Sequence, residues 1–171
     1  MNDFKQTVLD IEKERTILIN EMSNWFDKIK SHTENVPLDL NSQIKLLETI
    51  RKDLYENINQ IQHSALIIKA AEELKIKYPS VDSWTWHPKQ TSHPDFADLT
   101  GYVKNEVFIN VEVTTSLKPV GTIDQRMIST LTKLNSKSGF KFYYVLTKEM
   151  ALRAKTKIKN NNFDIEIREI S

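Results

Sequence analysis

The sequence predicts an α/β domain with a mixed sheet flanked by helices over residues 55–171, preceded by a helical hairpin over residues 1–54. Three observations lead to this prediction. Apolar residues recur at helical spacing before Pro79 and alternate at strand spacing after it. Two acids, Asp98 and Glu112, lie on neighbouring predicted strands. Lysine and arginine are concentrated in the C-terminal third of the chain.

Length and composition suit one globular domain with an appendage. The chain has 171 residues, of which 39% are hydrophobic and 27% are charged, as in folded rather than disordered proteins. It contains no cysteine, which excludes disulfides and thiolate zinc sites. The N-terminal residues are too charged for a signal peptide, and no apolar run approaches the ~20 residues that cross a bilayer. We therefore expect a cytoplasmic protein without membrane contact.

Two predicted helices, separated at Pro37, form the N-terminal hairpin. Apolar residues of the first are Phe4, Val8, Ile11, Leu18, Met22, Trp25 and Ile29, with Arg15 at one expected apolar place. Those of the second are Leu40, Ile44, Leu47, Leu54, Ile58, Ile61, Ala65 and Ile68, with Arg51 at the missing place. Asn41 or Ser42 could cap this second helix. Such heptad spacing favours coiled-coil-like packing, either within one chain docked on its own domain or as an arm that pairs two copies.

After Pro79 the predicted elements are mainly strands, then strands alternating with helices. The expected order is strands at 81–86, 98–103 and 107–113, a helix at 122–135, a strand at 140–146, a basic helix at 150–159 and a strand at 163–168. Lys104 and Asn105 can turn the chain between the second and third strands. Trp84 and Trp86 share one strand face, where core packing is favoured over base stacking.

The two acids carry the chemistry that the sequence suggests. Asp98 begins one predicted strand and Glu112 lies near the end of the next, so a hairpin would bring both to one end of the sheet. Two adjacent carboxylates repel each other unless a cation lies between them. Oxygen ligands suit Mg²⁺, or the similar Mn²⁺, which can orient water and stabilise the charge on a phosphodiester. Asp95 is the alternative to Asp98, which is favoured because it directly begins the strand.

These acids and the order of elements resemble the PD-(D/E)XK superfamily, which contains restriction-endonuclease-like nucleases. The family core runs helix, three-stranded meander, helix and strand, as predicted for residues 55–146. Asp98 matches the acid that opens the second strand, and Glu112 matches the acid near the end of the third. The resemblance implies that both bind metal together with the backbone carbonyl of Val113. Thr114 stands where the family has lysine, and its hydroxyl can hold water but cannot supply that charge.

Two further residues, and one position on the helix before the strands, are candidates for assisting this site. Lys118 could reach back from the loop after the third strand, and Gln125 could contact phosphate or metal-bound water, unless it simply faces solvent. Relatives often carry a glutamate on the helix that enters the domain. Here the matching position is Asn59, Gln62 or His63, and each could equally be a polar surface residue.

Charge is distributed unevenly along the chain. Residues 1–60 contain eight Lys or Arg against eleven Asp or Glu, whereas residues 115–160 contain ten against two. A basic half of this kind suggests a surface for a polyanion, although solvated helix faces would give the same count. The candidate contacts to a nucleic-acid backbone are Lys148, Arg153, Lys155 and Lys157.

Taken together, the residues and the resemblance favour an endonuclease that uses Mg²⁺ or Mn²⁺ to hydrolyse phosphodiester bonds. DNA is favoured over RNA as the substrate, with restriction, defence or repair as the setting and a homodimer formed through the N-terminal helices. The alternative is a catalytically inactive nuclease-fold module for nucleic-acid binding or complex assembly, and Thr114 is the residue that favours it.

Overall fold

The computed structural model describes residues 7–34, 36–37, 39–87 and 96–170. Within them the elements are β1 (Thr7–Val8), α1 (Ile11–Thr33), α2 (Leu40–Lys77), β2 (Ser83–Trp86), β3 (Leu99–Val103), β4 (Glu106–Thr114), α3 (Thr122–Asn135), β5 (Phe140–Val145), α4 (Lys148–Asn161) and β6 (Glu166–Glu169). No helix of this described part is long and apolar enough to cross a bilayer.

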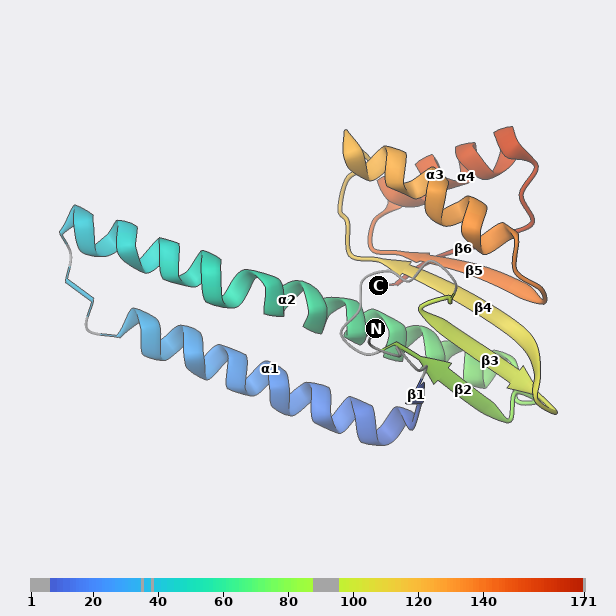
Figure 1. The fold of residues 1–171 in the computed structure, drawn as a ribbon, viewed down its shortest axis with the longest axis horizontal. Coiled ribbons are helices and arrows are strands. Elements are labelled where there is room, and N and C mark those ends of the chain that lie inside the picture. The colour runs from blue at the N-terminus through green and yellow to red at the C-terminus, as the bar shows by residue number, and fades with distance from the viewer. Residues whose placement is uncertain (1–6, 35, 38, 88–95, 171) are drawn as a thin grey trace, which may run out of the picture.

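The strands form one mixed sheet in the order β1-β2-β3-β4-β5-β6. Neighbours from β1 to β4 are antiparallel, whereas β4, β5 and β6 are parallel to one another. The helices α3 and α4 make the crossovers between these parallel strands and cover one face of the sheet (Figure 1). The C-terminal half of α2 covers the other face (Figure 1). The predicted α/β class, with a mixed sheet between helices, is therefore confirmed.

Strand β4 separates two hydrophobic cores. Its residues Ile109, Val111 and Val113 pack in the core that contains α2. The alternating residues Asn110 and Glu112 therefore face the other core, formed by α3 and α4. Neighbouring β5 obeys the same alternation, because its residues divide between the two cores. The polar side chains of Asn110 and Glu112 are thus buried on the side of β4 that α3 covers.

The hairpin between β3 and β4 has the tight turn that the sequence predicted. Lys104 and Asn105 have φ values of 51° and 65°, as a two-residue primed turn requires. A register shift follows Gly101. A Cβ atom at Gly101 would lie 2.8 Å from the Trp84 ring, so glycine allows this indole to cover the strand. Trp84 and Trp86 are buried in the core, which confirms the packing role predicted for them.

The N-terminal segment differs from the prediction of a single helix. Val8 lies in β1, which pairs with β2, and α1 begins only at Ile11. Asp10 caps the helix by accepting a hydrogen bond from the Lys13 N–H. The apolar period alone could not reveal that β2 offers a free edge whose backbone groups pair with Thr7 and Val8. Phe4, also placed in the predicted helix, lies outside the described residues.

Helix α2 is continuous from Leu40 to Lys77, so the boundary expected between residues 54 and 55 falls inside it. Its cap is Asp39, whose carboxylate accepts from the Ser42 N–H at 3.0 Å, and not Asn41 or Ser42. The prediction misplaced the cap because the acidic residue preceding the helix satisfies the same N–H groups. The helix ends at Lys77, just before Pro79, as predicted.

An arm extends beyond the sheet, and we define it as residues 22–33 of α1 and 40–58 of α2, which lie side by side (Figure 1). The apolar residues predicted to form the seam of α2 are largely solvent-accessible there. Leu40, Ile44 and Leu47 are 74%, 46% and 65% exposed. The side chain of Leu54 lies outside the described residues. Arg15, one of the two seam arginines, instead forms an ion pair with Glu72 at 3.4 Å.

Candidate functional site

Asp98 lies immediately before β3 and is 5% exposed. Its Oδ2 atom accepts a hydrogen bond of 2.8 Å from the backbone N–H of Val113 in β4. The backbone carbonyl of Asp98 also accepts from the His87 N–H at 3.4 Å, which ties the residue to the end of β2. These contacts hold the carboxylate at the end of the hairpin where β4 carries Glu112. The other candidate acid, Asp95, lies outside the described residues.

Glu112 is 3% exposed, and its side chain points to the α3 side of β4. Burial, reinforced by the nearby charge of Asp98, raises the pKa of Glu112 to about 8. The charges of Lys133 and Lys137 act in the opposite direction. The charge of Asp98 therefore acts on Glu112, and the two lysines offset only part of the increase in the pKa of Glu112.

Lys133 on α3 is the residue that compensates Glu112 most directly. Its Nζ lies 2.5 Å from Glu112 Oε1, and it donates to the backbone carbonyl of Phe96 at 3.3 Å. The Lys133 side chain is 19% exposed, so most of it is shielded from water. Sequence reasoning missed this role and counted Lys133 only among the basic residues. The available clue was its place on the predicted helix that follows the acids in the chain, next to apolar Leu134.

His63 is the one residue among the three helix candidates that is buried beside an acid. It is 4% exposed, and its Nε2 lies 3.4 Å from Asp98 Oδ2. Neither ring nitrogen has a hydrogen-bond partner within the part of the chain described. Gln62 is exposed and Asn59 is half-buried. The structure thus brings His63, Asp98 and Glu112 together, with His63 entering from the α2 side.

Thr114 lies two residues after Glu112 in β4 and is half-buried. Its hydroxyl accepts from the Ser116 N–H at 3.3 Å and also shares a hydrogen bond with the Tyr143 hydroxyl. Burial raises the pKa of Tyr143 well above its usual range, so this hydroxyl is neutral near pH 7. Thr114 is therefore near the acids, but its hydroxyl already has partners.

Two other predicted assistants lie away from the acids. Lys118 is exposed in the loop after β4, and Gln125 is exposed in the first turn of α3. Neither is among the described contacts of Asp98 or Glu112, whereas Lys133 from the last turn of α3 is. Val113 meets the site through its N–H group, which bonds Asp98, and not through a described contact of its carbonyl.

Among the described residues, no group of three or more His, Cys, Asp or Glu side chains is placed to hold a metal ion. The available donor set is therefore the Asp98 and Glu112 carboxylates. Such a pair remains compatible with Mg²⁺, which usually keeps several waters and binds protein through one or two carboxylates together with substrate phosphates. The under-compensated charge of the pair, expressed in the raised pKa of Glu112, is the feature that a divalent cation would relieve.

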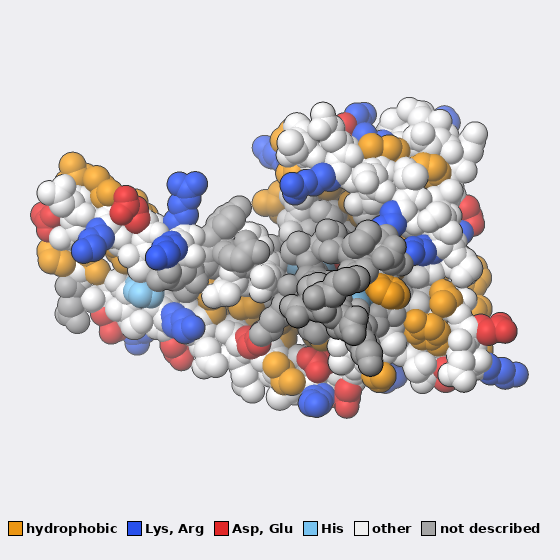
Figure 2. Space-filling model, viewed as in Figure 1, with side chains coloured by type: hydrophobic (Ala, Val, Ile, Leu, Met, Phe, Trp, Pro, Cys, Tyr) orange, Lys and Arg blue, Asp and Glu red, His pale blue; other side chains and the backbone are white. Residues whose placement is uncertain are grey.

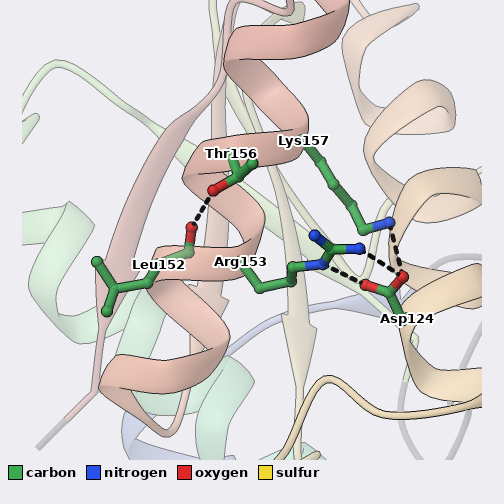
Figure 3. A network of polar contacts seen from close by, with 5 residues as sticks. All are labelled: Asp124, Leu152, Arg153, Thr156 and Lys157. Carbon is green, nitrogen blue, oxygen red and sulfur yellow. Dashed lines mark hydrogen bonds and ion pairs between the residues drawn. The ribbon is translucent and has the colours of Figure 1, made fainter.

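The basic segment of α4 is partly neutralised within the chain. Arg153 forms a two-pronged contact with Asp124 at 2.7 and 2.9 Å, and Lys157 contacts the same carboxylate at 3.1 Å (Figure 3). Together these cations hold the pKa of Asp124 well below its usual range. Lys148 and Lys155 are exposed. Lys and Arg side chains gather over α3 and α4 in Figure 2, whereas the arm shows both signs of charge.

No family model, curated protein or solved structure matches this chain.

Proposed function

We propose that the chain is a nuclease that hydrolyses phosphodiester bonds of DNA with Mg²⁺ or Mn²⁺, in restriction, defence or repair. The observation that carries this proposal is the buried pair of Asp98 and Glu112 at the end of the β3–β4 hairpin. Burying two like charges side by side is costly, and such clusters are concentrated at functional sites. A metal ion bound there would orient the attacking water and stabilise the charge that develops on the phosphate.

The contacts of the two acids support a shared role for them. The Val113 N–H fixes the direction of the Asp98 carboxylate, which lies beside the His63 ring. Glu112 approaches from the neighbouring strand, on the side covered by α3. Both acids would hold the cation, and Tyr143 would remain a neutral hydroxyl next to them because its pKa is raised. His63 would flank Asp98, with its Nε2 atom 3.4 Å from Asp98 Oδ2.

The order of elements supports the resemblance to PD-(D/E)XK nucleases. Helix α2 is followed by the antiparallel meander β2-β3-β4, then by α3 and the parallel strand β5. This is the order expected of that family's core, with the acids at the start of the second strand and near the end of the third. Thr114 remains the departure from the family motif.

The arm supports a proposal about assembly. Leu40 and Leu47 expose most of their surface, and Phe26 on α1 is 62% exposed. Exposed apolar side chains grouped along a projecting helix are typical of interaction surfaces. We propose that the arm pairs with a second copy of the chain, because a two-fold dimer would bury the same surface on both copies and present two cleavage sites to a duplex.

A second function is favoured by one observation. The Lys133 ammonium already lies against Glu112 and neutralises part of the pair without a metal. A site satisfied in this way, with Thr114 in place of lysine, suits a catalytically inactive module that binds nucleic acid or assembles a complex.

Incubation of supercoiled plasmid with the protein tests the nuclease proposal. Cleavage should require Mg²⁺ or Mn²⁺ and should fall on the order of 10³-fold or more in Asp98→Asn, because metal stabilisation is worth several kcal/mol and each 1.36 kcal/mol is tenfold. The matched control is Asp27→Asn, which changes an exposed acid on α1. The same metals should raise the melting temperature of wild type but not of Asp98→Asn.

A wild-type protein that cleaves neither DNA nor RNA with either metal, and that shows no metal-dependent stabilisation, would contradict the nuclease proposal. Retained binding to duplex DNA in that case would favour the inactive module.

A further inference from the structure

We infer that Lys133 supplies the scissile phosphate with the positive charge that position 114 lacks. The inference rests on the proposed nuclease function and assigns one more catalytic residue to the same site. Its basis is that Lys133 on α3 reaches Glu112, which lies only two residues before Thr114 on β4.

Thr114 is poorly suited to this role. Its hydroxyl is neutral and is engaged by the Ser116 N–H and by Tyr143. A hydroxyl in this position can stabilise a strand end, but it cannot offset the charge of a phosphate. If a lysine offsets the charge of the scissile phosphate in this chain, it must come from another element.

Lys133 has the placement that such a cation requires. It contacts Glu112 of β4 at 2.5 Å and the Phe96 carbonyl, two residues before Asp98, at 3.3 Å. The ammonium is thus held between the two segments that carry the acids. Because its side chain is only 19% exposed, its electrostatic interactions there are stronger than they would be in water. The same contacts keep the charge in place before substrate arrives, so little reorganisation is required.

Other lysines fit less well. Lys137 influences Glu112 through its charge but forms no described hydrogen bond with it. Lys118 is exposed in the loop after β4. Lys137 is therefore a matched control, and Lys118 is the competing candidate.

A charge-relocation experiment tests the inference with the full chain, plasmid DNA and Mg²⁺. Lys133→Met should lower kcat for cleavage by about 10²–10³-fold, the cost typical of removing one group that stabilises transition-state charge. Adding Thr114→Lys to Lys133→Met should restore cleavage, since side chains at 112 and 114 share one face of the strand. Lys137→Met should keep most of the activity.

A lysine at position 114 could also offset the charge of Glu112, because both side chains lie on one face of β4. Rescue of kcat by Thr114→Lys without a matching rise in the free energy of unfolding therefore separates catalysis from a structural role. If Lys133→Met does not fold, Lys133→Gln removes the charge while keeping a polar group beside Glu112, and the same rescue applies. A loss that Thr114→Lys does not reverse in either background would assign Lys133 a structural role and overturn the inference.

Two other outcomes are distinguishable. Active wild type with equally active Lys133→Met and Lys133→Gln overturns the inference alone, particularly if Lys118→Met is the variant that loses activity. Wild type that is as inert as Asp98→Asn overturns the proposed nuclease function, and the inference with it.

Discussion

The arm and the end of the β3–β4 hairpin are unusual in opposite ways. The arm exposes apolar side chains, whereas the hairpin end buries polar and charged ones. In the arm, large apolar side chains are exposed, with Leu40 at 74% and Leu47 at 65% (Figure 2). At the hairpin, the polar groups of His63, Asp98 and Glu112 are buried at 3–5% exposure. Charged residues are almost never fully buried unless paired, and grouped exposed apolar residues are characteristic of binding surfaces. Each departure costs stability in the isolated chain, and each is relieved by a different kind of partner.

The two regions can be probed independently, because each would bind a different kind of partner. Apolar surface from another copy would bury the exposed side chains of the arm. A cation and a phosphate would bind at the end of the hairpin. Substitutions in the arm should therefore change association, whereas substitutions at the hairpin should change chemistry and pH dependence.

The largest expected effect is a difference in the free energy of unfolding between substitutions in the buried and in the exposed part of α2. Leu74→Ala removes a fully buried side chain of α2 and should lower the free energy of unfolding by about 2–5 kcal/mol. Leu47→Ala, on the arm, should change it by about 0.5 kcal/mol or less. Urea denaturation followed by circular dichroism measures both. Equal losses at the two positions would mean that Leu47 is already packed in the isolated chain.

The next effect concerns the proposed dimer. Leu40→Glu combined with Leu47→Glu should weaken self-association by at least about 10²-fold, because a buried leucine contributes about 1.5–3 kcal/mol and each 1.4 kcal/mol is tenfold. Sedimentation velocity over a concentration series measures this, and Ile76→Glu, 84% exposed at the other end of α2, is the control. A monomeric wild type at high concentration contradicts the dimer.

Deletion of residues 1–40 is a less informative test of the arm. It would also remove β1 from the sheet edge and the buried side chains of Leu9, Ile11 and Leu18 from the core. Any loss of association would then be mixed with a loss of folding.

A smaller effect should appear in the pH dependence of stability. Glu112 has a pKa of about 8 in the folded chain against an ordinary value of 4.5, so the folded state binds more protons between these limits. The free energy of unfolding should therefore fall as pH rises through this window, by up to about 1.4 kcal/mol per pH unit. Urea midpoints between about pH 5 and 8 should fall less steeply in Glu112→Gln. An unchanged slope in that variant would show that Glu112 is ionised throughout.

The smallest expected effect is on the salt dependence of DNA binding, and it should differ between the exposed and the paired basic residues of α4. Lys148 and Lys155 are exposed, whereas Arg153 and Lys157 are paired with Asp124. Reversing Lys148 and Lys155 should flatten the log–log salt dependence of DNA binding by about 0.9 for each phosphate that the protein no longer neutralises. Substituting Arg153 and Lys157 by Met should change the slope less. An unchanged slope in the first pair would exclude those two residues from the interface.

Several elements could be predicted because their sequence pattern is local. The helix at Thr122–Asn135 has the predicted bounds, and the Lys104–Asn105 turn has the predicted form. Asp98 and Glu112 could be paired from sequence because a short turn joins their strands. In each case the relevant residues are close in the chain, so period and turn chemistry suffice.

Other features required contacts between distant segments. Val8 joins the sheet because β2 has a free edge, and Lys133 meets Glu112 because the crossover after β4 lays α3 over the sheet. His63 could be named only as one of three helix residues, since its direction depends on how α2 packs against the sheet. Leu40 and Leu47 follow the heptad pattern but face solvent, because the described packing of the arm does not cover them.

By itself the sequence determined the α/β class, most helix and strand positions, and the pairing of two acids on adjacent strands. These follow from hydrophobic period, turn residues and the reach of a short hairpin, all of which act over a few residues. Only the tertiary structure decided that Lys133 compensates Glu112, that His63 lies beside Asp98, and that Asp124 binds Arg153 and Lys157. The burial and direction of each side chain depend on the helices and strands that pack against it. Those elements come from distant parts of the chain, and residue spacing in the sequence does not show that they meet.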